Sequence, residues 1–319
     1  MKITLDLTKL VETGKLTSAE AERLRALGAH ETGALGINIL IGFGVVAVAA
    51  GALALVPTPF TAIVLGIMMF ASGFALTLKK SEQWDLLAQV CIVVGALMFA
   101  GGILAFNKGS LASMMMVTAT FAGAALLARS SLLMAGAVLA LASCFGAKAG
   151  YWHASYALAI YEPTLTVVVF GALAWVAYLV SRNLPSDFER LAIIASRTSV
   201  FLVNFGFWIG SLWGDRMIMI RSMMATDPNA VASSIKSLVI GPWTFVIAWA
   251  VALIAVAVWG VKANRRWVVN VAAVFGGIHF YTQWFEKLGP NPMTFFIGGI
   301  LMLVFALGLW QFNKKMTSA

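Results

Sequence analysis

Ten runs of predominantly apolar residues, separated by short polar or basic breaks, constrain this chain more than any other feature. A helix needs about 20 apolar residues to cross a bilayer, and it satisfies all its backbone hydrogen bonds internally. The sequence therefore predicts an all-α fold, a polytopic transmembrane helical bundle of about ten spans. The predicted spans are 34–56, 58–78, 86–106, 110–128, 131–148, 163–181, 190–213, 241–261, 267–284 and 293–312.

Composition supports this class. The chain is 61% hydrophobic and only 11% charged, whereas soluble domains carry about 25% charged residues. We therefore expect most of its surface to contact the lipid bilayer. The net charge of +9 suits basic cytoplasmic loops, so no nucleic-acid partner is predicted.

The stretch 264–315 orients the predicted spans. Lys262, Arg265 and Arg266 flank its first apolar run, and Lys314 and Lys315 follow its second, so both ends of this hairpin are basic. With the N-terminus in the cytoplasm, sixteen of the 22 Lys and Arg residues fall on the inner side and six on the outer side. By the positive-inside rule, this predicts a multi-pass protein of the cell inner membrane with both termini cytoplasmic.

Residues 1–32 form the one substantial polar block, and 33–319 form the predicted bundle. We expect a cytosolic pair of short amphipathic helices, the first ended by Gly14 and the second by Gly28. Helices this short are marginal alone in water, so they pack as a small cap or dock a protein partner at residues 2–31. The opening Met-Lys-Ile and its mixed charges do not resemble a cleavable signal peptide.

Two capping boxes mark predicted helix starts. Thr17 followed by Glu20 opens the second helix of the N-terminal pair, and Ser186 followed by Glu189 opens the helix that contains the seventh span. Small-residue pairs such as Ala47/Gly51 and Gly101-Gly102 indicate close helix packing.

None of the 13 acidic residues lies near the centre of a predicted span. Ion-coupled carriers usually need a carboxylate there, so this distribution disfavours a secondary transporter. Candidate ligand-binding or polar-core residues are therefore the few other polar groups within spans. They are Asn38, Arg197, Asn204, Asn270, His279 and Gln283.

Each candidate has a structural and a functional interpretation. Arg197 lies seven residues after Arg190 on the same helix face, where it reaches the cytoplasmic headgroups or binds an anion such as a lipid phosphate. His279 shares a face with Gln283 and either joins two helices or handles a ligand or proton. Buried amides such as Asn204 more often join helices.

No enzyme motif is present in the sequence: HExxH, GxSxG, Walker and GxGxxG patterns are all missing. Cys91 and Cys144 lie within apolar runs, as small packing residues do. We therefore predict no catalytic, cofactor-binding or metal site and no cofactor, and expect a protein that is not an enzyme.

Two end stretches resemble a known family. They read LTKLVETGKLTSAEAERL and NRRWVVNVAAVFGGIHFYTQWFEKLGPNPMTFFIGGILMLVFALGLW. Together they are similar to bacterial predicted membrane proteins carrying the domain of unknown function 2157. The resemblance implies an all-helical inner-membrane bundle and transfers no functional residue.

Three functions remain open. The leading one is a non-enzymatic membrane scaffold or partner-docking, regulatory protein, which also leaves a homo-oligomer open. The second is a small-solute permease or exporter, since ten spans suit two inverted five-helix repeats. The third is a lipid-handling protein or intramembrane enzyme that uses Arg197 or His279. A cavity lined by Asn38, Arg197, Asn204 or His279 would best distinguish them.

Overall fold

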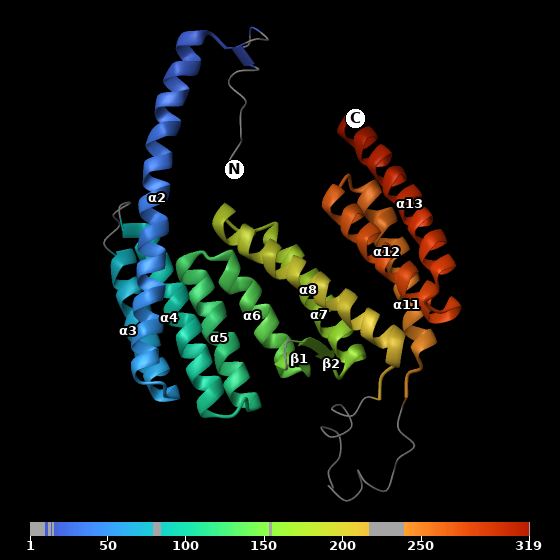
Figure 1. The fold of residues 1–319 in the computed structure, drawn as a ribbon, viewed down its shortest axis with the longest axis horizontal. Helices are drawn as coiled ribbons and strands as arrows, with labels where there is room; N and C mark the ends of the chain where they lie inside the picture. Colours follow the sequence, from blue (N-terminus) through green and yellow to red (C-terminus); the bar gives the residue numbers. More distant parts are fainter. Residues whose placement is uncertain are drawn as a thin grey trace, which may run out of the picture. The chain divides into compact units, whose positions relative to one another are not determined.

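A computed structural model of the chain describes residues 10–11, 14, 16–78, 84–152, 155–216 and 239–318, with side chains described outside 25–39, 147–159 and 312–318. The chain divides into two compact units, unit 1 (Met1–Ala137) and unit 2 (Val138–Ala319). Unit 1 holds α2 (Ser18–Leu55), α3 (Pro59–Leu78), α4 (Asp85–Phe106), α5 (Leu111–Ala128) and the start of α6 (Ser131–Cys144) (Figure 1). Unit 2 follows with β1 (Ala147–Trp152), β2 (Ser155–Ile160), α7 (Pro163–Ser181), α8 (Ser186–Trp213), α11 (Pro242–Lys262), α12 (Arg266–Leu288) and α13 (Pro292–Ser318).

Each predicted span overlaps one of these helices, and the helical class of the fold is confirmed. Within the described residues, seven helices are long and apolar enough to cross a membrane, as a multi-pass membrane protein requires. They are α3, α4, α5, α7, α8, α11 and the Pro292–Gln311 part of α13. The apolar part of α2 is the shorter Leu40–Leu55, α6 has only 14 residues, and α12 is long enough but too polar.

The predicted capping box at Thr17 is confirmed. The Thr17 backbone N–H donates to Glu20 Oε2 at 2.9 Å, and the Glu20 N–H donates to Thr17 Oγ1 at 3.3 Å. The expected helix end at Gly28 is wrong, because α2 continues to Leu55. One glycine inside a helix costs only about 1 kcal/mol relative to alanine, which good helix formers on both sides offset. Gly14 has a φ of 68°, as a helix-ending turn requires.

Two other predictions fail in part: α8 begins at Ser186 as expected but without the capping box, and one span is shorter than predicted. The Ser186 box does not form, because Pro185 precedes the helix as its N-cap and accepts the Glu189 N–H at 2.8 Å, without any side-chain cap bond. The span predicted to reach residue 148 ends at Cys144. A two-stranded antiparallel hairpin follows, with Ala147 opposite Ile160 and Trp152 opposite Ser155. Tyr151 pairs with Tyr156 in this hairpin.

Unit 1 is built on very close contact between α3 and α4. A β-carbon added to Gly66 would lie 2.5 Å from the Phe99 backbone nitrogen, and one added to Gly95 would lie 2.5 Å from that of Phe70. Side chains larger than hydrogen are therefore excluded at this crossing. Next to it, a small apolar core joins α4, α5 and α6. Its buried members are Ile92, Ala96, Ala124, Ala125, Ala128 and Leu133.

Unit 2 pairs α7 with α8 and α11 with α12. Gly206 of α8 faces the Pro163 carbonyl of α7, and an added β-carbon there would lie 3.3 Å from that oxygen. Trp208 of α8 donates its indole N–H to Thr282 Oγ1 of α12 at 3.0 Å. Asp215, just after α8, accepts the Thr164 N–H at 2.8 Å and so fixes the start of α7. These contacts hold four helices around the space described next.

Candidate functional site

Four helices of unit 2, α7, α8, α11 and α12, surround a pocket of about 840 Å³. This volume lies within the range of roughly 300–1,000 Å³ that is usual for small-molecule sites. The turns 182–185 and 263–265 both lie near one end of the pocket, because residues close to each turn line it. The pocket therefore has a turn end and a far end.

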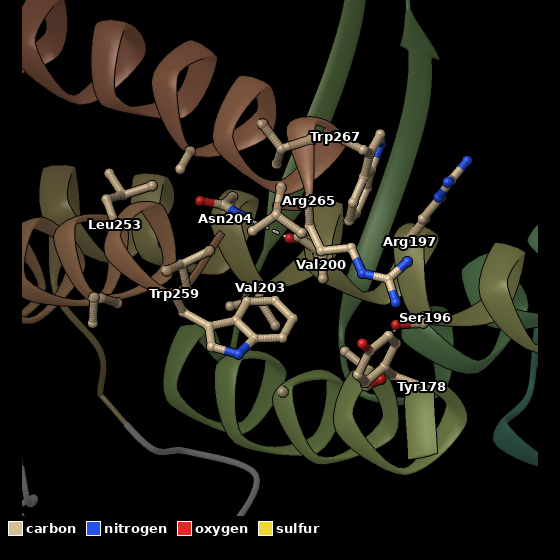
Figure 2. A pocket seen from close by; sticks show the side chains of 18 of the residues that line it. Tyr178, Ser196, Arg197, Val200, Val203, Asn204, Leu253, Trp259, Arg265 and Trp267 are labelled. Atoms are coloured by element: carbon tan, nitrogen blue, oxygen red, sulfur yellow. Dashed lines mark hydrogen bonds between the residues drawn. The ribbon is translucent and has the colours of Figure 1, made fainter. Parts of the chain in front are cut away.

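The turn end is basic. Arg197 of α8 lines it together with Arg265 and Arg266 at the start of α12. The Arg197 guanidinium carbon lies 4.8 Å from the centre of the Trp267 ring, a cation–π contact. Figure 2 shows the Arg265 side chain pointing toward Tyr178 and Ser196, with Arg197 beside Trp267. The described residues that line the pocket include no Asp or Glu, so this end presents positive charge.

Tyr178 brings a further cation to the same end. Arg182, in the α7–α8 turn, donates to the Tyr178 hydroxyl at 3.1 Å and lies 4.9 Å from its ring centre. The other edge of the ring meets Trp259 of α11, with ring centres 6.0 Å apart. The aromatic rings thus hold arginine side chains at this end, where an anionic group would find hydrogen-bond donors.

The walls beyond the arginines are apolar. Val200 and Val203 of α8 face Leu253 and Val256 of α11 across the pocket. The Ser196 hydroxyl donates to the Ala174 carbonyl at 2.8 Å and so joins α7 to α8. A bound molecule would therefore meet positive charge at one end and hydrocarbon along most of its length.

The far end is closed by Trp249 of α11. This side chain is fully buried, and its indole N–H donates to Asn204 Oδ1 at 2.9 Å. The ring is parallel to that of Phe207, with centres 6.5 Å apart, and meets the His279 ring edge-on at 4.9 Å. Three neighbours thus fix the indole in place. In Figure 2, Asn204 and Leu253 lie on the opposite side of the pocket from Tyr178 and Arg197.

The structure brings two of the six candidate residues to this pocket. Arg197 and Asn204 line it, and His279 lies directly behind Trp249. Asn270 and Gln283, on the same helix as His279, are not among the lining residues. His279 Nδ1 and Gln283 Nε2 are buried without a hydrogen-bond partner. The Asn38 side chain lies outside the described residues.

Sequence reasoning missed the other residues of the site. In the sequence, Arg265 and Arg266 indicate only the orientation of the spans, and no pattern distinguishes Trp249 or Tyr178. One signal was available: Trp259 and Trp267 flank a basic turn, and Arg197 stands about two turns inside a predicted span. Which faces meet depends on the pairing of four helices, which one sequence does not give.

The described residues contain no group of three or more His, Cys, Asp or Glu placed to hold a metal ion. Comparisons with protein-family models, with curated proteins and with solved structures find no match. The interpretation of the pocket therefore depends on its own residues.

Proposed function

We propose that this chain is a non-enzymatic integral membrane protein whose second unit binds an anionic amphiphile. The main support is that one pocket has three arginines at one end and apolar walls beyond them. A phosphate or carboxylate at the turn end would accept charge-assisted hydrogen bonds, and its acyl chain would be buried along the walls. Among the three functions open from the sequence, this supports lipid handling.

The position of the arginines suits the cytoplasmic leaflet. In the proposed ten-span arrangement with both termini cytoplasmic, the turns 182–185 and 263–265 face the cytoplasm. Both turns lie at the same end of unit 2, as that arrangement requires. A lipid of the inner leaflet would therefore place its headgroup at Arg197 and Arg265. The resemblance to inner-membrane proteins with the domain of unknown function 2157 suits the same location.

The remaining functions are less well supported. The permease hypothesis needs a polar cavity, and the walls of this pocket are largely apolar. Partner docking at residues 2–31 stays a prediction, because most of this segment has no described side chains. The intramembrane enzyme hypothesis gains no support, since the pocket lining includes neither His279 nor an acid.

Thermal unfolding of the full-length protein in a nonionic detergent tests the proposal. We expect dodecyl phosphate to raise the midpoint more than dodecanol does, because only the phosphate meets the arginines. Arg265→Gln and Arg197→Gln should each reduce affinity about tenfold or more, the usual effect of losing a hydrogen bond to a charged group. Arg190→Gln is the matched control, because this exposed residue is on α8 but does not line the pocket. Equal stabilisation by dodecanol would contradict the proposal.

A further inference from the structure

We infer that the Trp249 indole acts as the floor of the pocket and sets the longest acyl chain that the ligand can carry. This inference rests on the proposed function and adds a specificity determinant to it. The ligand class is then a single-chain anionic amphiphile of limited length, such as an alkyl phosphate or a fatty acid. The apolar walls of the pocket would hold the acyl chain of the ligand, and the arginines would bind its anionic group.

Two helices give the same depth for the pocket. On α8, ten positions separate Arg197 at the turn end from Phe207 at the far end. On α11, ten positions likewise separate Trp259 at the turn end from Trp249 at the far end. At 1.5 Å per residue, the depth is about 15 Å. This is about half the ~30 Å hydrocarbon core of a bilayer, or one leaflet. An extended chain advances roughly 1.3 Å per carbon, so about twelve carbons fit.

The floor is fixed and does not move aside easily. Trp249 is fully buried and is held by the Asn204 amide, by the parallel Phe207 ring and by the edge of His279. Moving the indole would break its hydrogen bond to Asn204 Oδ1. The N–H and the oxygen would then lack a partner within the membrane, which is unfavourable. A chain longer than the pocket must therefore bend or shift its headgroup away from the arginines.

Gly171 of α7 offers an independent way to change the depth. It lines the pocket between Tyr178 and the far end, and a β-carbon added there would lie 4.0 Å from Val203 Cγ2, an ordinary contact. A leucine at this position can therefore be accommodated on the helix, while its outer atoms occupy pocket volume. We therefore expect Gly171→Leu to reduce the longest acyl chain that the pocket accepts, while the arginines and Trp249 stay unchanged.

Native mass spectrometry of the full-length protein, offered an equimolar micellar mixture of alkyl phosphates of eight to sixteen carbons, tests the inference. We expect wild type to retain chains up to about twelve carbons and to retain sixteen carbons about tenfold less, because a longer chain overpacks the space above Trp249. Trp249→Ala should bring sixteen carbons within about twofold of twelve, and Gly171→Leu should shift the limit below twelve. Ile247→Ala, an exposed position of α11 that does not line the pocket, should leave the limit unchanged.

The outcomes separate the two proposals. If wild type, Trp249→Ala and Gly171→Leu all prefer the anion and share the same limit of chain length, Trp249 does not set that limit. Anion binding, and with it the proposed function, would still stand. If Trp249→Ala does not fold, the Gly171→Leu limit decides alone. Inorganic phosphate is added as a competitor, and we expect it to displace no alkyl phosphate. Displacement by inorganic phosphate would identify a site for the free anion and would overturn the assignment of an amphiphile.

Discussion

A side-chain hydrogen bond between Trp249 of α11 and Asn204 of α8 lies at the far end of the pocket. Asn204 also donates to the Val200 carbonyl of its own helix at 2.8 Å, so its amide orientation is fixed from both sides. The pair is buried away from the arginines. At the scale of single residues, this bond therefore determines where the pocket ends.

We predict that Asn204→Ala destabilises unit 2 by about 1–2 kcal/mol, because the buried Trp249 indole N–H loses its acceptor. Asn183→Ala, in the exposed α7–α8 turn, is the control and should change stability little. Reversible unfolding in mixed micelles, followed by tryptophan fluorescence, measures both. Equal stability of the two variants would show that the bond contributes nothing.

The sequence indicated part of this site. Arg197 and Asn204 were recognisable because a charged or amide side chain within an apolar run is costly unless it has a use. Trp249 carried no such signal, since tryptophan is common in membrane helices. Helical spacing predicts which residues share a face, as for His279 and Gln283, but it does not predict which helix that face meets. The partners of Asn204 and Trp249 were therefore beyond prediction.

Close packing of α3 on α4 dominates unit 1 at the scale of helices. Gly66 and Gly73 on α3 and Gly95 and Gly102 on α4 are each seven residues apart, and all four face backbone atoms of the other helix within 3 Å of an added β-carbon. The small-residue pairs noted in the sequence include only one of them. Gly51 and Gly101 have open space around them. Glycine frequency thus predicted close packing but not its location.

Gly95→Ala should separate α3 from α4 and destabilise unit 1 by about 1–3 kcal/mol, as overpacking of a tight contact does. Gly101→Ala, six residues along the same helix with nothing near its β-carbon, should be neutral or slightly stabilising. Thermal unfolding of the two variants in the same detergent compares them. A larger effect at Gly101 would contradict this packing.

The start of α2 should depend on pH. The backbone N–H and then the hydroxyl of Thr17 donate to the Glu20 carboxylate, and they lower its pKa. A lowered pKa means that the cap stabilises the helix above the unfolded-state pKa of about 4.3, and that this contribution is lost as pH falls through the folded-state pKa. Hydrogen exchange, corrected for intrinsic rates, should show residues 18–24 losing protection between pH 6 and pH 3. Glu20→Gln, which cannot titrate, should show a smaller loss, and an equal loss would exclude the carboxylate as the cause.

At the scale of the whole molecule, hydropathy was sufficient to predict the class of fold, because lipid permits few backbone structures. It did not predict the division into two units, the continuous α2 or the β-hairpin, which depend on contacts between segments. Large exposed apolar side chains, such as Phe60 of α3 and Phe296 of α13, suit contact with lipid. Which ends of the helices face the cytoplasm is predicted only from the distribution of Lys and Arg residues.

Cysteine labelling tests the proposed ten-span arrangement. In a background lacking Cys91 and Cys144, Asn183→Cys in the α7–α8 turn should react with an impermeant maleimide only after the cytoplasmic side is opened. Asn107→Cys, in the turn after α4, should react in intact cells. The same accessibility at both positions would refute this arrangement.

The most direct test of the pocket is photolabelling of the full-length protein with dodecyl phosphate that carries a diazirine at its terminal carbon. Mass spectrometry then maps the labelled residues. With the phosphate at Arg197 and Arg265, the terminal carbon should label α8 and α11 around Phe207, Trp249 and Leu253, and excess unlabelled dodecyl phosphate should suppress this labelling. Labelling spread over the exposed apolar faces of α3 and α13, unchanged by the competitor or by Arg265→Gln, would contradict a binding pocket in unit 2.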